Sequence, residues 1–396
     1  MIRKTTWLLV ALLSLSCSRS GIPLKDGGQA KGKLFTVDNS GDTGYYLNLA
    51  MGQRDQAQLV YYDRQAKSLK YVRQSAGGFA VDTVDDTCNR CLYATIRVTA
   101  EGEPHIAYAN DATQTLMYAY RKNNQWKRES IEWGPGTGMG VRLLFDEKGT
   151  LHALYYSGDG FLKHAWRVLQ EAGELQPTPL EIPKPKRGGA APKAGSPPPE
   201  PPEGIWGNER VDKANGSEQV QISFVRKPQG GMAASYFHWS GMSSELRLAF
   251  QNDDGTWKTL VAARDNNPGK SSALFFDVDG TPRVVFREAL KDRLMLGREK
   301  DGAWMAEPLL PDAYNMALAT DATGKVLLAY QEMRGADPRK GTLCMLIGDK
   351  GVWTRYRVDD TPGSGYFLDA DLTVDSRPVI GFFEESGKKV KLFVGE

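Results

Sequence analysis

Short runs of alternating apolar and polar residues, separated by turns rich in glycine and aspartate, repeat along most of the chain. The stretch "GEPHIAY" at 102–108 returns as "GTLHALY" at 149–155. In both, a glycine turn leads into a run of the kind that forms a β-strand, whose successive side chains point to opposite faces of a sheet. Because glycine and aspartate supply the backbone angles that hairpins need, the pattern predicts an all-β protein of repeated hairpins.

One aromatic residue marks each repeat, because it follows a turn and opens a β-rich strand that often ends in Val-Asp. It occurs at Phe35, Phe79, Trp126, Trp206, Trp257, Trp304 and Trp353, with spacings of 44, 47, 80, 51, 47 and 49 residues. Each repeat also holds three earlier strands, for example at 141–146, 151–156 and 162–166. A period near fifty residues with four short strands predicts a β-propeller of seven four-stranded antiparallel blades.

The two ends of the chain are expected to share one blade. The last repeat begins at Gly365 and stops after three strands, whereas Leu34–Asp38 is a fourth strand without a blade of its own. An open ring would expose two unpaired sheet edges. We therefore predict that Leu34–Asp38 pairs with the C-terminal blade and closes the ring.

The single long spacing has a separate cause. Residues 171–204 include eight prolines between Pro183 and Pro202, a composition typical of extended, disordered segments. The segment ends at "GIWGNERVD" (204–212), which supplies the fourth strand that blade three still lacks. We interpret it as an insertion inside blade three rather than a linker between domains.

The N-terminus carries the pattern of a secretory signal. Residues 1–16 combine a basic start with an apolar run from Trp7 to Leu15, which is shorter than the ~20 residues of a membrane-spanning helix. The sequence Leu13-Ser14-Leu15-Ser16-Cys17 resembles the bacterial lipoprotein signal, in which the cysteine carries the lipid, although the family usually has leucine at the position of Ser14.

This resemblance implies acyl chains such as palmitate on Cys17. Because serine rather than aspartate follows the cysteine, it also implies the outer membrane, facing the periplasm or the cell surface. Ordinary cleavage would instead leave a secreted soluble protein. Residues 17–32 are polar and glycine-rich and are interpreted as a flexible tether, so that the propeller occupies 33–396.

The net charge of the chain limits the classes of macromolecule that it is expected to bind. Removal of Arg3 and Lys4 with the signal leaves 48 basic and 48 acidic residues from the original 50 and 48. Nucleic acids require clustered positive charge, so a nucleic-acid partner is not expected. The expected contacts are the membrane, through the lipid, and a polysaccharide or an envelope protein.

The cysteines and histidines give little evidence of chemistry. Cys88 and Cys91 form "CNRC" before a strand, so a local disulfide in an oxidising compartment is favoured over a redox pair, which usually lies at a helix N-terminus. Cys344 is expected in the core. His105 and His152 occupy one register of two blades and are interpreted as sheet residues; no metal or cofactor is predicted.

The Val-Asp endings of the fourth strands are expected to ring one face of the propeller. They place carboxylates at Asp38, Asp85, Asp212 and Asp359. Calcium requires six or more oxygens converging on one point, whereas these carboxylates belong to different blades. We therefore expect them to be solvated caps of loops.

Two turns, Asp254-Gly255-Thr256-Trp257 and Asp301-Gly302-Ala303-Trp304, are shortened forms of the Asp-box Asp-x-Gly-x-Thr-Trp. The periodic pattern thus resembles bacterial secreted propellers of the sialidase-like and Asp-box repeat type. The resemblance implies the fold but not the activity. The three arginines, the tyrosine nucleophile with its glutamate and the acidic aspartate of sialidases cannot be assigned, and those enzymes have six blades rather than seven.

Ligand-binding residues are expected on the face formed by the loops between blades and the loops joining second and third strands. Aromatic rings with carboxylates and arginines suit a sugar or a peptide, and Trp239 is the foremost candidate. The candidates are Tyr46, Tyr93, Trp239, Arg287, Glu288, Tyr314, Glu332, Arg334 and Tyr366. The sequence favours an envelope-anchored binding or scaffolding lipoprotein over an enzyme. The alternative is a divergent, sialidase-like glycoside hydrolase or lyase with two carboxylates in a central pocket, whose catalytic residues are unassigned.

Overall fold

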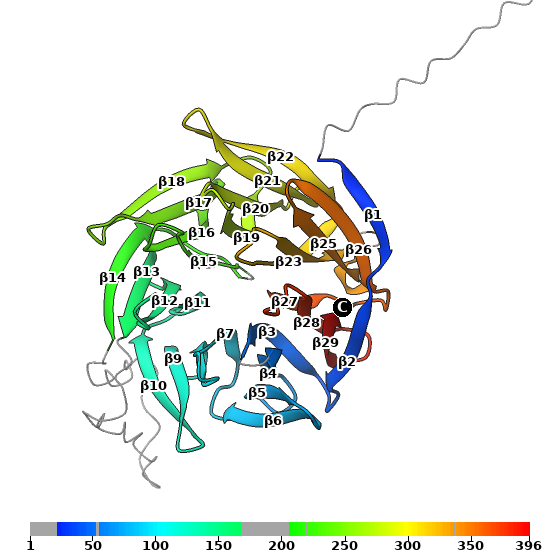
Figure 1. The fold of residues 1–396 in the computed structure, drawn as a ribbon. Coiled ribbons are helices and arrows are strands. Elements are labelled where there is room, and N and C mark those ends of the chain that lie inside the picture. Colours follow the sequence, from blue (N-terminus) through cyan, green and yellow to red (C-terminus); the bar gives the residue numbers. More distant parts are fainter. Residues whose placement is uncertain (1–21, 53–54, 168–205, 219, 334, 336) are drawn as a thin grey trace, which may run out of the picture.

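The chain folds into a ring of seven sheets, a seven-bladed β-propeller, as predicted (Figure 1). The structure, a computed structural model, describes residues 22–52, 55–167, 206–218, 220–333, 335 and 337–396. The first strand of each blade lies near the ring axis and the fourth at the rim. We call the face with the loops between blades and the loops joining second and third strands the crossover face, and the opposite one the hairpin face.

Blades one to three follow in chain order. Blade one holds β3 (Thr43–Met51), β4 (Ala57–Asp63), β5 (Ser68–Ser75) and β6 (Gly78–Asp85). Blade two holds β7 (Cys91–Val98), β8 (Pro104–Asn110), β9 (Thr115–Lys122) and β10 (Gln125–Trp133). Blade three holds β11 (Met139–Phe145), β12 (Leu151–Ser157), β13 (Phe161–Arg167) and β14 (Gly207–Lys213).

Blades four to seven complete the ring. Blade four holds β15 (Ser223–Arg226), β16 (Met232–Trp239), β17 (Ser244–Gln251) and β18 (Trp257–Ala263). Blade five holds β19 (Pro268–Phe276), β20 (Pro282–Glu288), β21 (Arg293–Lys300) and β22 (Ala303–Pro311). Blade six holds β23 (Ala313–Thr320), β24 (Val326–Glu332), a 3-10 turn (Pro338–Lys340), β25 (Thr342–Asp349) and β26 (Val352–Asp359). Blade seven holds β27 (Tyr366–Leu372), β28 (Pro378–Glu384), β29 (Lys389–Gly395) and β2 (Gly32–Asp38).

The N-terminal part of the chain closes the ring twice. Strand β2 pairs antiparallel with β29, with Leu34 opposite Phe393, which confirms the predicted closure. The strand before it was not predicted: β1 (Leu24–Gln29) pairs parallel with β26 and becomes the fifth strand of blade six. Part of the predicted tether is therefore sheet, because the free edge of β26 supplies hydrogen-bonding groups that a glycine-rich segment can satisfy.

Strands β13 and β14 pair antiparallel within blade three, although 39 residues separate the end of one from the start of the other. The chain thus leaves blade three at Arg167 and returns to the same blade at Gly207. The proline-rich segment 171–204 and the signal around Cys17 lie outside the described residues. In the parts of the chain that are described, no helix has the length and hydropathy of a membrane span.

The Val-Asp endings are not solvated caps, which corrects the sequence prediction. Asp85 is only 2% exposed, and its carboxylate accepts a hydrogen bond of 2.6 Å from the Tyr108 hydroxyl of the next blade. Tyr61 donates in the same way to Asp38, and Tyr236 to Asp212. Each of these three carboxylates ties the outer strand of one blade to the second strand of the next, whereas the buried Asp359 accepts from Lys391 on the third strand of the next blade at 2.9 Å.

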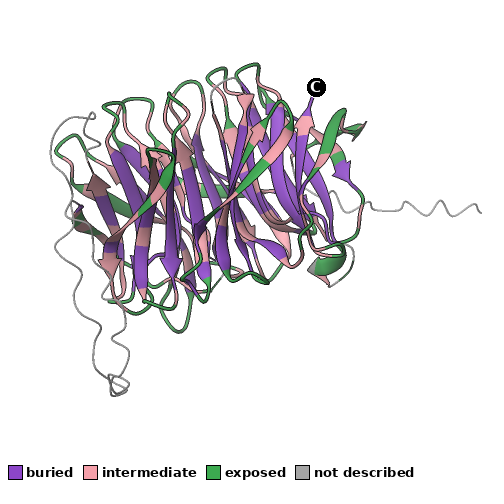
Figure 2. Cartoon of the chain, turned by 90° about the horizontal axis from the view of Figure 1, so that it is seen from below, coloured by how far each residue is buried: buried purple, intermediate pink, exposed green. Residues whose placement is uncertain are grey.

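The marker aromatics have a related role between blades. Trp126 packs edge-on against Tyr71 of the preceding blade at 5.2 Å, and Trp257 packs against His164 at 5.5 Å. Figure 2 shows that buried residues concentrate along the strands, whereas exposed residues gather in the loops of the two faces. The repeat seen in the sequence is thus a repeat of inter-blade contacts. His105 and His152 lie in strands β8 and β12, and Cys344 is buried, as expected.

Candidate functional site

The inner strand of every blade except blade four contains a β-bulge near its start, close to the crossover face. In blade one the register shifts between Tyr45 and Asn48, which places Tyr46 in the bulge. Tyr46 has a φ of 54°, in the left-handed region that non-glycine residues rarely adopt. The equivalent residues Tyr93 and Phe367 have φ values of 56° and 43°. A bulge re-aims a side chain, and strained backbone clusters at functional sites.

These bulges bring aromatic rings of neighbouring blades together. The Tyr46 ring centroid lies 5.2 Å from that of Tyr93 and 5.2 Å from that of Phe367. Phe367 contacts Tyr366 at 5.0 Å, and Tyr366 stacks with Tyr314 at 6.5 Å. We call these five residues the aromatic arc. The arc crosses blades two, one, seven and six on the crossover face.

Charged side chains flank both ends of the aromatic arc. The Arg287 guanidinium lies 4.7 Å over the Tyr314 ring and donates to the carbonyl of Ala313. At the other end, the Arg90 Nε donates to the Asp111 carboxylate at 3.0 Å, and the Arg90 side chain is 59% exposed. The arc therefore offers apolar ring faces between positively charged guanidinium groups and a negatively charged carboxylate.

Burial raises the pKa of two tyrosines in the arc, Tyr46 and Tyr366. It raises the pKa of Tyr46, with Arg90 opposing this effect and nearby carboxylates adding to it. Burial likewise raises the pKa of Tyr366, and the neighbouring Tyr314 and Glu385 reinforce the shift. Both side chains thus remain neutral hydroxyl groups, which can donate hydrogen bonds to a ligand.

A chain of buried hydrogen bonds lies under the aromatic arc. The Asp369 carboxylate of blade seven accepts from the Asn48 side chain at 2.5 Å and from the Leu49 N–H at 2.8 Å. Asn48 in turn accepts from the Thr95 hydroxyl at 3.2 Å and from the Ile96 N–H at 2.7 Å. Inner strands of blades seven, one and two are thereby fixed relative to one another.

Two carboxyls of β27 bear on the hydrolase alternative. Asp369 and Asp371 are two residues apart and so share one face of the strand. Burial raises the pKa of both, as an acid catalyst would require. However, both bind the neighbouring strand, because Asp371 accepts from the Met51 N–H at 3.0 Å much as Asp369 accepts from Leu49. Their geometry is that of inter-blade anchors.

The structure gathers five of the nine predicted ligand-binding residues. Tyr46, Tyr93, Tyr314 and Tyr366 belong to the aromatic arc, and Arg287 adjoins it. Sequence reasoning missed Phe367 and Asp369. Comparison of "GYYLN" at 44–48 with "GYFLD" at 365–369 could have identified both, since the bulge falls at the third position of each.

The other predicted residues lie elsewhere. Glu288 is buried and accepts from Arg293 at 2.6 Å, so it is a structural group rather than a rim residue. Glu332 accepts from Arg355 of its own blade at 2.5 Å. Trp239 is 42% exposed on blade four, outside the aromatic arc. Arg334 lies outside the described residues.

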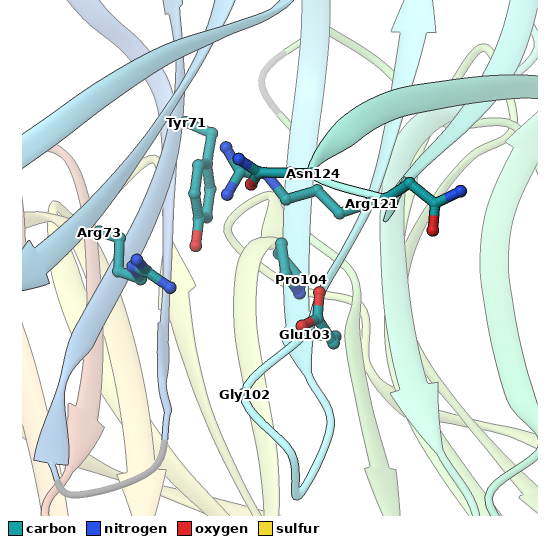
Figure 3. A pocket seen from close by; sticks show the side chains of 8 residues that line it. Tyr71, Arg73, Gly102, Glu103, Pro104, Arg121 and Asn124 are labelled. Atoms are coloured by element: carbon teal, nitrogen blue, oxygen red, sulfur yellow. The ribbon is translucent and has the colours of Figure 1, made fainter.

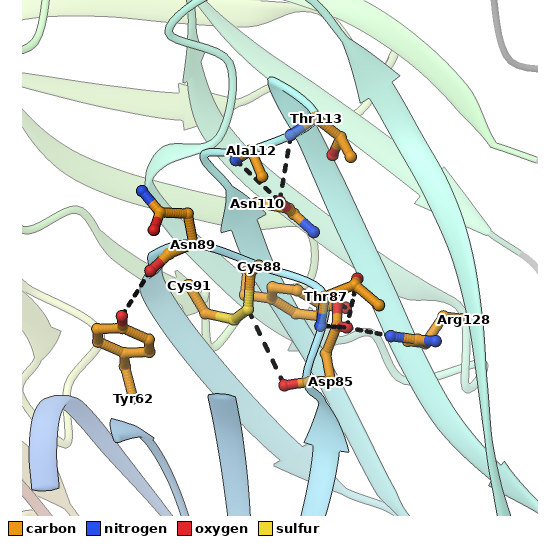
Figure 4. The surroundings of a disulfide bond; sticks show 11 residues. Tyr62, Asp85, Thr87, Cys88, Asn89, Cys91, Asn110, Ala112, Thr113 and Arg128 are labelled. Atoms are coloured by element: carbon orange, nitrogen blue, oxygen red, sulfur yellow. Dashed lines mark hydrogen bonds and ion pairs between the residues drawn. A yellow bond between two sulfur atoms is a disulfide. The ribbon is translucent and has the colours of Figure 1, made fainter. Parts of the chain in front are cut away.

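A disulfide joins Cys88 and Cys91 in the loop between blades one and two (Figure 4). Both cysteines are buried, and the loop is held further by the Tyr62 hydroxyl, which donates to the Asn89 carbonyl at 2.6 Å. This loop carries Arg90 and leads directly into the strand that bears Tyr93 of the arc. The disulfide therefore orders one end of the candidate site.

A small polar pocket lies on the hairpin face between blades one and two (Figure 3). Its volume is about 220 Å³, and its lining includes Tyr71, Arg73, Glu103 and Arg121. Arg121 also forms an ion pair with Asp82 and covers the Tyr71 ring, so it serves the inter-blade contact. Within the described residues, no cluster of three or more His, Cys, Asp or Glu is placed to hold a metal ion.

Comparisons with known proteins support the fold alone. No family model matches the chain, and no curated protein matches its sequence. Among solved structures, an ulvan lyase of polysaccharide lyase family PL25 has a TM-score of 0.54 at 10% identity, covering 94% of this chain and 95% of the lyase. YCF48 bound to D1 peptide has a TM-score of 0.55 at 11% identity, covering 96% of this chain and 100% of YCF48. A protein of unknown function from Dyadobacter fermentans has a TM-score of 0.51 at 13% identity, covering 92% of this chain and 98% of that protein. At such identities these proteins share an architecture with the chain, and their ligands are not transferable on that ground.

Proposed function

We propose that this protein is a binding or scaffolding propeller of the cell envelope whose ligand lies along the aromatic arc. The observation that carries the proposal is the row of five rings, three of them in strained left-handed bulges of adjacent blades. Strain of this kind costs about 1–3 kcal/mol per residue. A packing role alone would be served at lower cost by glycine, which blade three has at the equivalent position, Gly140.

The chemistry of the aromatic arc suits a polysaccharide first. Sugar rings present apolar C–H faces to aromatic rings and hydroxyls to polar groups, and the arc offers rings flanked by Arg90, Asp111 and Arg287. A peptide segment of an envelope protein is the other ligand of this kind. The distant neighbours include a polysaccharide lyase and a protein bound to a peptide, so this architecture accommodates ligands of both classes.

The hydrolase alternative rests on Asp369 and Asp371, whose raised pKa values would suit an acid catalyst. We favour binding because both carboxyls already accept N–H groups of β3, at 2.8 Å and 3.0 Å. A carboxyl that holds a neighbouring backbone has little freedom to transfer a proton to a ligand. Release of sugar products by the wild type, abolished in a folded Asp369→Asn variant, would favour the enzyme instead.

The ligand is tested with a glycan array and a pair of variants. Tyr46→Gly removes the central ring of the arc at a backbone angle that glycine tolerates, and we expect it to lower any glycan signal at least tenfold. Trp239→Ala is the matched control, since it removes an exposed ring outside the arc. Loss of the glycan signal with Trp239→Ala but not with Tyr46→Gly would place binding on blade four and contradict the proposal. If every glycan fails, pull-down of an envelope protein that Tyr46→Gly abolishes would support the peptide ligand.

The anchor is a separate part of the proposal. We propose that a lipid on Cys17 holds the propeller at the outer membrane. Each buried CH₂ of an acyl chain contributes about 0.8 kcal/mol to membrane binding, so several chains would retain the protein firmly. Cys17→Ser should move the protein from the membrane fraction to the soluble fraction. Unchanged fractionation would contradict lipidation and leave the ligand proposal intact.

A further inference from the structure

The seams between neighbouring blades are closed by arginines in two places. Between blades one and two, the Arg121 guanidinium lies 5.1 Å over the Trp126 ring and 5.4 Å over Tyr71. Between blades two and three, Arg167 covers Tyr118 at 5.2 Å. In the first seam the guanidinium covers the marker tryptophan itself, and in the second it covers the tyrosine against which the marker Trp206 packs edge-on at 5.3 Å.

The seam between blades four and five lacks this arginine. Register identifies the equivalent residue: Arg121 is opposite Trp126 in blade two, and Glu299 is opposite Trp304 in blade five. The Glu299 side chain is exposed. A groove of about 820 Å³ opens here, with Phe250, Phe276 and Trp304 among its apolar lining and charged groups including Lys258 and Glu299.

The next seam shows what such a groove accepts. Between blades five and six, Ile22 and Leu24 of the N-terminal segment pack against the hydrophobic cluster that contains Trp353. The Ile22 N–H donates to the Pro308 carbonyl at 3.2 Å, and Leu24 lies in register with Trp353 in the β1–β26 pairing. An extended segment thus fills this seam by adding a strand to the rim and inserting apolar side chains.

The groove between blades four and five presents the same features, and none of the described strands is added at its rim. Trp304 is the counterpart of Trp353, since both are the marker aromatic of a fourth strand. Val261, which lines the groove, lies four residues after Trp257, just as Pro308 lies four residues after Trp304. Among the described residues, β22 forms the outer edge of its sheet and carries no fifth strand there, unlike β26.

We propose that this groove is a docking site for an extended peptide segment of a partner protein, which adds a strand along β22 and places an apolar side chain against Trp304. Backbone hydrogen bonds to an open edge supply affinity in this mode of recognition, and side-chain pockets supply specificity. The groove lining carries Lys227 and Lys258 alongside Asp253 and Glu299. It therefore suits a segment bearing both signs of charge, as Lys25-Asp26 does in β1. This site is independent of the aromatic arc.

The probe is a fluorescently labelled synthetic peptide with the sequence of residues 22–29, IPLKDGGQ, titrated with the mature chain and followed by anisotropy. We expect saturable binding that Ala303→Trp weakens at least tenfold, because Ala303 is exposed and lines the groove. Thr259→Trp is the matched control: it adds the same ring at an exposed position of β18 between two lining residues, Lys258 and Leu260. A peptide with aspartate in place of both Ile22 and Leu24 should not bind.

Hydrogen exchange locates the bound peptide. We expect the peptide to protect amides of 303–305 on β22. Protection or release of 353–357 instead would mean that the peptide displaces β1 from blade six, which would overturn the proposal. Absence of saturable binding, or equal weakening by Ala303→Trp and Thr259→Trp, would do so as well. Concentration-dependent dimerisation that Ala303→Trp abolishes would identify a second copy of this chain as the occupant and exclude a separate partner.

Discussion

The two halves of the crossover face use the same bulge position in opposite ways. Blades seven, one and two place Phe367, Tyr46 and Tyr93 there, in left-handed backbone. Blades three and five place Gly140 and Gly269 in the corresponding bulges, with φ values of 66° and 88°. The left-handed bulge is therefore shared by five blades, whereas only three of them place an aromatic ring in it. This difference separates what the fold requires from what a ligand would require.

The halves also differ in how their inner strands are joined. The aromatic half uses the buried chain from Asp369 through Asn48 to Thr95. The glycine half uses serine hydroxyls: Ser223 accepts from the Leu274 N–H at 3.0 Å, and Ser235 lies 2.8 Å from Ser272. A carboxylate and an amide hold the strands beneath the aromatic arc more strongly than hydroxyls hold those opposite it.

The largest effect is expected from breaking these joints one at a time. Asp369→Ala leaves the Asn48 amide and the Leu49 N–H without their acceptor. Since each buried unsatisfied group costs about 1–3 kcal/mol, we expect a loss of about 4 kcal/mol in the free energy of unfolding. Ser223→Ala removes one hydroxyl acceptor and should cost about 1 kcal/mol. Urea denaturation measures both, and equal losses would show that the two halves are joined equally well.

A second effect, of about 3 kcal/mol, should appear only in acid. Gln58 in blade one and His105 in blade two occupy the same position on the second strand of their blades. The Tyr71 hydroxyl donates to the Gln58 side chain at 2.6 Å. In the same way the Tyr118 hydroxyl lies 2.5 Å from His105 Nδ1. Burial, with a smaller contribution from the Arg167 charge, lowers the pKa of His105 to about 4.

The sign of the pH effect follows from this lowered pKa. Above pH 6.5 the imidazole is neutral in both folded and unfolded chains, so it contributes nothing. Below 6.5 the unfolded chain binds a proton that the folded chain rejects until about pH 4. At about 1.4 kcal/mol per pKa unit, roughly 3 kcal/mol of stability is lost across that window. His105→Gln, which copies blade one, should flatten the decline in urea titrations, and an unchanged pH profile would contradict the assignment.

Much of this architecture could be predicted from the sequence because the repeats carry it. The marker aromatics at Trp126 and Trp257 recur since each seam needs a large side chain against the preceding blade. Strand β2 was predictable because a blade of three strands requires a fourth. Strand β1 was not predictable, because "LKDGGQ" has the composition of a linker and becomes a strand only against the edge of β26. The Tyr356 ring of β26 lies so close to Gly27 that a β-carbon on this residue would meet the ring at 2.2 Å.

The candidate site was predicted less completely than the fold. Tyr46 and Tyr93 were found because tyrosines near the start of an inner strand suggest a ring of aromatics. Phe367 was missed because register within a bulge, rather than residue type, decides which side chain enters the aromatic arc. Asp85 was misjudged because its partner, Tyr108, is 23 residues away on another blade. Contacts between blades are visible only once the ring is assembled.

The smallest expected change in the free energy of unfolding tests whether the aromatic bulge residues destabilise the backbone by strain. Tyr46→Ala loses ring contacts with Tyr93 and Phe367 but keeps a β-carbon in left-handed backbone. Tyr46→Gly loses the same contacts and relieves the strain, so it should be more stable than Tyr46→Ala by about 1 kcal/mol. Gly269→Ala gives the reverse comparison, since its β-carbon would lie 3.0 Å from the Leu246 side chain, and it should cost about 2 kcal/mol. Urea denaturation of the three variants measures these differences. If Tyr46→Gly and Tyr46→Ala proved equally stable, the bulge would carry no strain there, and the structural reason for assigning the aromatic arc to ligand binding would be lost.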